Sequence, residues 1–100
     1  MEGQSIRFAR RGRLEIISAI LSMCRADSPI GKTRIMYKSN LSYSQLQGYL
    51  ALLVRIGFLE KESIGGTEFF KLTKKGGEFL KEYQRIMRLL EGEMKTKGEA

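Results

Sequence analysis

The chain has 100 residues, and its 18 Lys and Arg residues outnumber its 11 Asp and Glu residues, so the formal net charge is +7. A chain of this length makes a single small domain, with room for a hydrophobic core but little for a deep substrate pocket. His is absent and Cys24 is the single cysteine, which excludes His-based catalysis, an intramolecular disulfide and a His- or Cys-built metal site. The acidic residues do not cluster as a carboxylate nuclease would require. We therefore expect no enzymatic activity, no metal and no cofactor.

The positive charge is concentrated in the first half of the chain. Residues 1–55 carry nine basic and three acidic side chains, whereas residues 56–100 carry nine basic and eight acidic ones. A concentrated positive field attracts polyanions, chiefly nucleic acid and less often an anionic membrane surface. No secretory signal opens the chain, and no apolar run approaches the roughly 20 residues of a membrane span. We expect a cytoplasmic, nucleoid-associated protein with no membrane partner.

Apolar residues at helical spacing predict a core-facing helix over residues 13–25. It follows a basic N-terminal arm, residues 1–12, which contains several arginines. Cys24 falls on the apolar stripe of this helix. We expect it to be a small buried hydrophobe rather than a reactive thiol.

A short second helix is expected after Pro29, because proline cannot continue the first helix. Residues 30–31 are expected to form an extended link. Thr33 is placed to cap the second helix, and Asn40 suits a left-handed turn at its end. We expect Tyr37 in this helix to lie in the core.

The third helix has the clearest start signal. Ser42 and Gln45 form a capping box, in which each side chain bonds to the backbone N–H of the other residue. Gly57 supplies a left-handed end, and Tyr49 is expected on the core-facing side together with leucines. The opposite face carries small, polar or basic residues: Tyr43, Ser44, Gln47, Gly48, Ala51 and Arg55.

Two short strands are predicted over residues 58–63 and 67–72. They flank the Gly65-Gly66 pair, and a double glycine between two β-prone runs is typical of a β-hairpin. Two strands are too few to build a core of their own, so we expect the hairpin to pack on the helices.

The last helix is expected over residues 74–95, with a frayed tail over residues 96–100. Thr73 is placed to cap it, and the glycines in its first turn allow close packing on the hairpin. Its apolar residues form a heptad-like seam, which fits either a coiled coil between two subunits or packing on its own domain. We favour a homodimer, because a helix of about 20 residues spans about 30 Å and overshoots so small a domain. The expected interface consists of Phe79, Leu80, Tyr83, Ile86, Met87, Leu90 and Met94.

This order of elements predicts a mainly helical α+β fold, in which a helix-turn-helix is followed by a β-hairpin wing. The chain resembles the small archaeal winged-helix DNA-binding proteins, a group of ten-kilodalton-class chromatin proteins and related transcription regulators. The resemblance rests on Lys-Thr-Arg-Ile-Met-Tyr at residues 32–37, Asn-Leu-Ser-Tyr at residues 40–43 and the spaced leucines that lead to Gly57. It covers about residues 13–90.

The resemblance implies a winged helix-turn-helix domain over residues 13–73 and an antiparallel coiled coil between the last helices of two subunits. It implies double-stranded DNA as the partner, with the third helix in the major groove and the wing on the minor groove or backbone. The recognition residues are then Ser42, Tyr43, Ser44, Gln47 and Gly48, and the wing residues are Lys61, Ser63, Gly65, Gly66 and Thr67. The second half of the third helix is more apolar than this pattern, so it either packs on the last helix or joins the interface.

The basic side chains of the first half are expected to contact phosphates or the minor groove, because the guanidinium group suits both. These residues are Arg7, Arg10, Arg11, Arg13, Lys32, Arg34 and Lys38. The alternative for the arm is a solubilising segment, and the alternative for the polar face of the third helix is a solvated surface. Two other functions stay open: a winged helix that acts only as a protein-interaction module, and an RNA-binding module.

Overall fold

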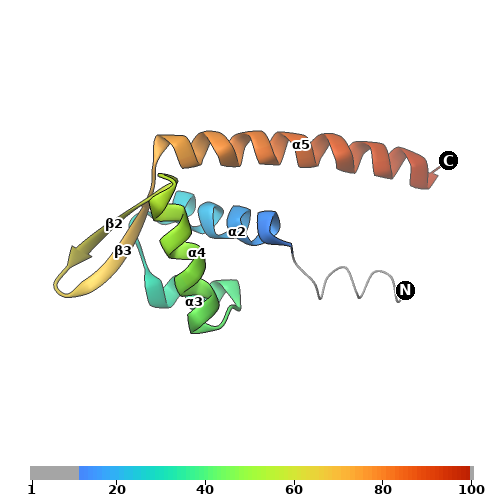
Figure 1. The fold of residues 1–100 in the computed structure, drawn as a ribbon. Coiled ribbons are helices and arrows are strands. Elements are labelled where there is room, and N and C mark those ends of the chain that lie inside the picture. The colour runs from blue at the N-terminus through green and yellow to red at the C-terminus, as the bar shows by residue number, and fades with distance from the viewer. Residues whose placement is uncertain (1–11, 100) are drawn as a thin grey trace.

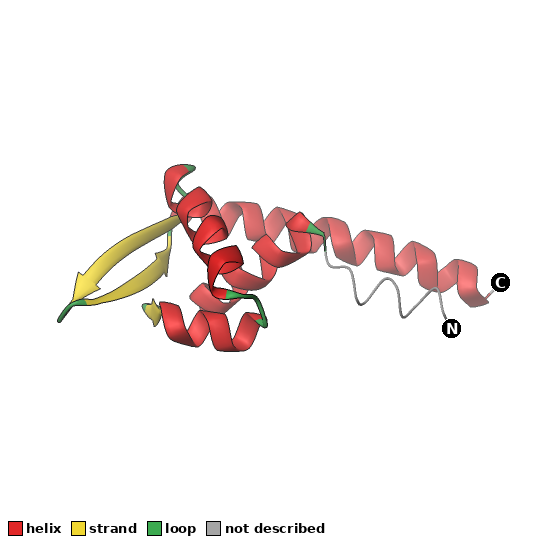
Figure 2. Cartoon of the chain, turned by 60° about the horizontal axis from the view of Figure 1, so that its bottom comes forward, coloured by secondary structure: helices red, strands yellow, loops and turns green. Residues whose placement is uncertain are grey.

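The computed structural model describes the backbone of residues 12–99 and the side chains of residues 12–92. Figure 1 shows α2 between the long helix α5 on one side and the α3–α4 pair on the other, with the β2–β3 hairpin projecting from one end. The elements are α2 (Arg13–Ala26), β1 (Ile30–Gly31), α3 (Lys32–Ser39), α4 (Tyr43–Arg55), β2 (Leu59–Ile64), β3 (Thr67–Leu72) and α5 (Lys74–Glu99). The expected mainly helical α+β architecture is confirmed, as Figure 2 shows by its colours.

Helix α2 forms the centre of the core. Ile20, Leu21 and Cys24 are fully buried on its apolar stripe. Burial raises the pKa of the Cys24 thiol from 9.0 to about 12, so the side chain is neutral and apolar in character. The expected role of Cys24 as a small buried hydrophobe is confirmed.

The segment between α2 and α3 differs from the prediction in two respects. Ile30 and Gly31 form a short strand that pairs with Phe70 and Phe69 of β3, so the hairpin becomes part of a three-stranded antiparallel sheet in the order β1-β3-β2. Because β1 ends at Gly31, α3 starts at Lys32 with Gly31 as its N-cap, and the prediction of Thr33 as the cap is wrong.

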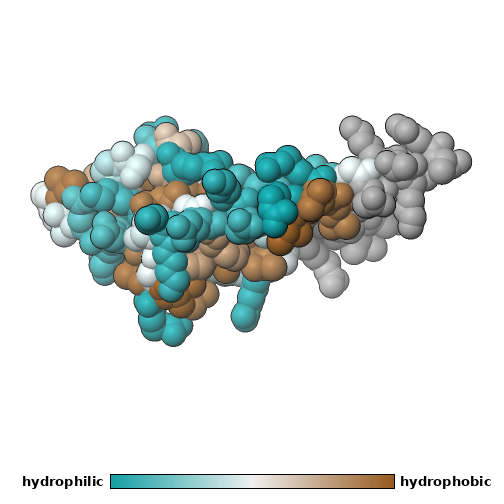
Figure 3. Space-filling view, turned by 90° about the horizontal axis from the view of Figure 1, so that it is seen from above, coloured by the Kyte–Doolittle hydropathy of each residue, from teal (hydrophilic) through white to brown (hydrophobic). Residues whose placement is uncertain are grey.

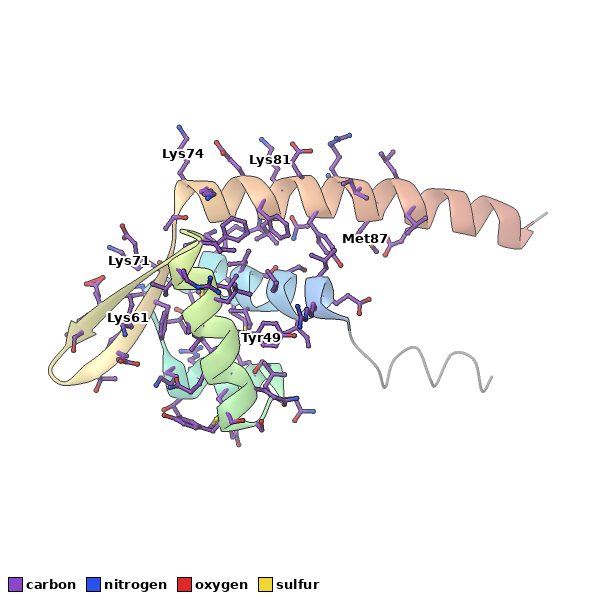
Figure 4. The ribbon with its side chains drawn as sticks, viewed as in Figure 1. Tyr49, Lys61, Lys71, Lys74, Lys81 and Met87 are labelled. Atoms are coloured by element: carbon purple, nitrogen blue, oxygen red, sulfur yellow. The ribbon has the colours of Figure 1, made fainter. Side chains whose placement is uncertain are left out.

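Tyr37 also departs from the prediction. Helix α3 buries Ile35 and Ser39, which lie one turn apart, and Tyr37 therefore points away from the core with 88% of its surface exposed. Tyr49 of α4 behaves as expected and packs against the core; Figure 4 shows it between α4 and α2.

The predicted signals at both ends of α4 are confirmed. The Ser42 hydroxyl accepts from the backbone N–H of Gln45 at 3.2 Å, and the Gln45 side-chain oxygen accepts from the backbone N–H of Ser42 at 3.1 Å. Asn40 before the helix has φ 62°, and Gly57 after it has φ 84°. The apolar residues Val54 and Ile56 pack against the core of their own domain, which accounts for part of the apolar second half of this helix.

The hairpin joins the core at its base and extends away from it at its tip. Leu59 and Phe70 are buried, whereas the residues around the turn are exposed. Gly65 and Gly66 form the turn with φ 58° and 82°, a left-handed pair that glycine adopts without steric cost. Ile64 and Thr67 pair across this turn.

Helix α5 starts where the prediction placed it and continues past the expected end at Lys95 to Glu99. The Thr73 hydroxyl accepts from the backbone N–H of Gly76 at 3.0 Å and donates to the Gly57 carbonyl at 2.6 Å. A Cβ at Gly76 would collide with the carbonyl oxygen of Phe58, so the expected close packing of a first-turn glycine on the hairpin is confirmed. This contact directs α5 back along α2.

Candidate nucleic-acid interface

The first half of α4 presents a polar, exposed face. Tyr43, Ser44, Gln47 and Gly48 are all exposed, and Tyr43 is 57% exposed although it is aromatic. A Cβ at Gly48 would meet nothing within 4 Å, so the backbone of α4 is open to close approach at this position. Ser42 precedes them as the helix cap, and the backbone N–H groups of the first turn give this end of the helix a partial positive charge.

The basic residues of α3 have acidic neighbours. The Lys32 ammonium lies 3.0 Å from the Glu68 carboxylate of β3 and 5.4 Å from the centre of the Tyr43 ring. Arg34 pairs with Asp27 at 3.1 Å, with both side chains largely exposed. Lys38 is exposed. The structure thus places Lys32 beside the start of α4 and joins both Lys32 and Arg34 to carboxylates.

The two faces of the hairpin differ. The strand register places Lys61 opposite Phe70, and Ser63 opposite Glu68, on the face that includes the buried Leu59. We call this the inner face of the hairpin, because it is directed toward α4. Thr67 alternates to the other face.

A hollow of about 250 Å³ separates α4 from the inner face of the hairpin. Gln47 and Arg55 of α4 line it from one side, and Lys61 and Glu68 line it from the other. Two elements that are distant in sequence therefore direct polar and charged groups to one place.

The structure brings Arg13, the first residue of α2, to a second hollow beside α4. Arg13 shares a hollow of about 380 Å³ with Ser44, Gly48 and Arg55. Arg7, Arg10 and Arg11 lie outside the described residues. Arg55 was not among the predicted contact residues, although its place on the polar face of α4 was visible in the sequence pattern.

Residues 10–91 match the family model described as winged helix-turn-helix. This chain belongs to the winged helix-turn-helix family. In its terms, α3 and α4 form the helix-turn-helix and the β2–β3 hairpin is the wing.

Three known proteins are similar to this chain. An uncharacterized protein of Methanocaldococcus jannaschii is 36% identical over 67 residues, which make up 67% of this chain and 64% of that protein. The crystal structure of Sso10a-2, a DNA-binding protein from Sulfolobus solfataricus, is 29% identical with a TM-score of 0.69, covering 89% of this chain and 95% of that one. The transcriptional regulator BldR from Sulfolobus solfataricus has a TM-score of 0.71 at 18% identity, covering 79% of this chain and 58% of that one, and shows a shared fold.

The C-terminal seam of this winged-helix protein divides into two parts. Leu80 is fully buried in the core, so its assignment to a subunit interface is corrected: it stabilises its own domain. Phe79 is half-buried and packs against the same core. Phe79 also contacts the rings of Phe58 and Tyr83 at centroid distances of 5.0 Å and 6.2 Å. Tyr83 is half-buried, and burial, assisted by the negative charge of Glu15, raises its pKa.

The second part of the seam is exposed. Ile86 is 54% exposed and Leu90 is 48% exposed, and Leu89, which the heptad spacing does not include, is 62% exposed. Figure 3 shows the corresponding hydrophobic surface on the second half of α5. Met87 is half-buried, and the Met94 side chain lies outside the described residues. Lys74 and Lys81 point away from the domain on the outer side of α5, as Figure 4 shows.

Two kinds of feature are absent from the described part of the winged helix. Within it no three His, Cys, Asp or Glu side chains come together in a way that could hold a metal ion. None of the described helices is both long enough and apolar enough to cross a membrane.

Proposed function

We propose that this chain binds double-stranded DNA through α4 and the wing, as a transcription regulator or chromatin protein. The observation that carries the proposal is that the exposed face of α4 and the inner face of the hairpin lie side by side. The exposed polar face of α4, with Gln47 and the open Gly48, lies beside a hairpin whose inner face holds Lys61. The likeness to Sso10a-2, whose structure is described as that of a DNA-binding protein, supports it at 29% identity over 89% of this chain.

In this proposal the first half of α4 enters the major groove. Gln47 is the residue most suited to base recognition, because its side-chain amide can form a bidentate pair with adenine. Tyr43 and Ser44 lie one turn earlier on the same exposed face and reach the groove wall. The absence of a side chain at Gly48 brings the helix backbone close to the DNA.

Phosphate contacts come from the basic residues that surround this helix. Lys38 and Arg34 of α3 contact the backbone on one side, and the arm with Arg11 and Arg13 contacts it on the other. Arg55 shares the hollow lined by Arg13, so the two guanidinium groups serve one stretch of backbone. The wing extends Gly65, Gly66 and Thr67 along the minor groove or the sugar-phosphate chain.

The protein acts as a homodimer in this proposal. The exposed apolar side chains Ile86, Leu89 and Leu90 lie in the middle of α5. Figure 1 shows that α5 continues beyond α2 toward its C-terminal end. An antiparallel coiled coil between two such helices buries these side chains and places two winged domains on one DNA. Residues 13–73 are then the DNA-binding unit, and α5 serves as the dimerisation helix.

Fluorescence anisotropy with duplex DNA over a salt series tests the proposal. The logarithm of the binding constant is expected to fall linearly with the logarithm of the salt concentration, with a slope of about −0.9 for each phosphate contact. No binding at low salt would overturn DNA binding and leave a protein-interaction module. A clear preference for single-stranded or duplex RNA in competition would also overturn it. Selection of bound sites from random duplexes then distinguishes a regulator, which yields a consensus, from an architectural protein, which yields none.

A further inference from the structure

A single carboxylate joins the three elements that surround the proposed DNA-binding face. Glu68 of β3 lies 3.0 Å from the Lys32 ammonium of α3 through one oxygen and 3.5 Å from the Lys61 ammonium of β2 through the other. Lys32 also lies over the ring of Tyr43, the first residue of α4, at 5.4 Å from its centre. Glu68 thus connects the helix-turn-helix to both strands of the wing.

Its position in the sheet places Glu68 on the side where DNA is expected. The register pairs it with Ser63, on the same inner face of the hairpin as Lys61. It lines the hollow between the hairpin and α4 together with Gln47 and Arg55, and it is the one acidic residue among those that line this hollow. Glu68 therefore places a negative charge beside Arg55 and Lys61, the two basic residues that line this hollow.

This charge persists at neutral pH. The Lys32 ammonium, and to a smaller extent that of Lys61, lowers the pKa of the Glu68 carboxyl below its usual value. Glu68 in turn raises the pKa of Lys32. The exposed fractions of the three side chains are 21% for Lys32, 40% for Glu68 and 51% for Lys61, so the cluster is accessible to a phosphate group.

We propose that Glu68 is an internal competitor for DNA phosphate that holds Lys32 and Lys61 and thereby sets the affinity for DNA. The inference rests on the DNA binding proposed above. A phosphate that reaches either lysine must displace or share the carboxylate, and the carboxylate repels the remaining backbone. A lysine already neutralised by Glu68 displaces fewer of the counterions condensed on the DNA, so its phosphate contact contributes less to the salt dependence of binding.

The test compares Glu68→Gln with wild type by anisotropy on one duplex over a salt series. Removing the charge frees two ammonium groups, and we expect binding to be roughly 5- to 10-fold tighter at low salt, with a salt slope steeper by about 1 to 2. Glu62→Gln is the matched control. Glu62 lies on the opposite face of the same hairpin and pairs with Lys71 at 3.4 Å, so its substitution should change the affinity by less than about 2-fold.

A second variant distinguishes the contribution of Lys32 from the general effect of removing one negative charge. In a Lys32→Ala background, Glu68→Gln should give a clearly smaller gain, because one of the freed cations is then missing. Thermal melts followed by circular dichroism establish that each variant is folded.

Three results would overturn the inference. One is Glu68→Gln binding no tighter than wild type, and another is a gain equal to that of Glu62→Gln. The third is weaker binding at an unchanged slope, which would make Glu68 a residue that only positions the lysines. If wild type itself fails to bind duplex DNA at low salt, the proposed function fails first and the inference fails with it.

Discussion

Gly48 offers a test in which stability and DNA binding should change in opposite directions. It lies in the interior of α4, it is exposed, and a Cβ built on it meets nothing within 4 Å. Glycine in a helix interior is about 0.8–1.0 kcal/mol less favourable than alanine, because its backbone loses more freedom on folding. Gly48→Ala should therefore stabilise the free protein by about 1 kcal/mol and raise its Tm by roughly 4–8 °C.

The same methyl group should weaken DNA binding. If α4 lies in the major groove with its backbone close to the DNA at Gly48, an added methyl group overpacks the interface. Overpacking of a well-packed contact costs about 1–3 kcal/mol, so we expect a loss of at least about 5-fold in affinity. Calorimetric or circular-dichroism melts at one protein concentration give the first quantity, and anisotropy with duplex DNA gives the second.

The same glycine-to-alanine change at Gly76 should have the opposite effect on stability. Gly76 also lies in a helix, but its Cβ would collide with the Phe58 carbonyl and approach Leu72 Cδ1 at 3.0 Å. We expect it to lower the stability by about 1–3 kcal/mol in spite of the better helix propensity of alanine. A Gly48→Ala protein that melts below wild type would refute the steric reasoning. One that melts higher and binds DNA unchanged would refute the placement of Gly48 at the DNA.

Three further predictions address assembly, recognition and the buried thiol. Ile86→Glu combined with Leu90→Glu should yield monomers by light scattering, because charges then replace the exposed apolar side chains of α5; an unchanged mass would exclude this surface as the interface. Gln47→Ala should alter sequence preference, whereas Arg11→Ala should weaken binding to all duplexes alike, and the site assignment is wrong if neither affects binding. Cys24 should resist thiol reagents in the native state. Its pKa is raised from 9.0 to about 12, so its burial stabilises the fold below about pH 9 and this contribution is lost as the pH rises toward 12. Rapid labelling at neutral pH would contradict its burial.

The local signals in the sequence determined most of the secondary structure. The capping box at Ser42 and Gln45 and the left-handed positions at Asn40 and Gly57 were each predicted from a few neighbouring residues, because caps and turns depend on short-range backbone hydrogen bonds and on allowed φ values. The hairpin turn at Gly65-Gly66 was predictable for the same reason. These signals, taken in their order along the chain, were sufficient to predict the winged helix-turn-helix.

The charge pattern of the proposed site was not predictable in the same way. Lys32 and Lys61 looked like free cations in the sequence, because nothing local indicates that Glu68 lies within ion-pair distance of both. The contact arises from the strand register of the hairpin and from the packing of α3 beside it. A two-residue strand such as β1 was likewise too short for any periodic signal and became a strand only by pairing with β3.

The two parts of the C-terminal seam show which properties the sequence determined and which the tertiary structure decided. The sequence by itself determined that α5 is a long amphipathic helix, since the repeat of apolar residues is a property of the chain. It did not determine what covers each part of the seam, because an apolar face packs equally well on its own domain or on a second subunit. The tertiary structure decided this for the described residues through the contact of Gly76 with Phe58, which directs α5 along α2. Leu80 is thereby buried in the domain, whereas Ile86 and Leu90, further along the helix, remain exposed to solvent.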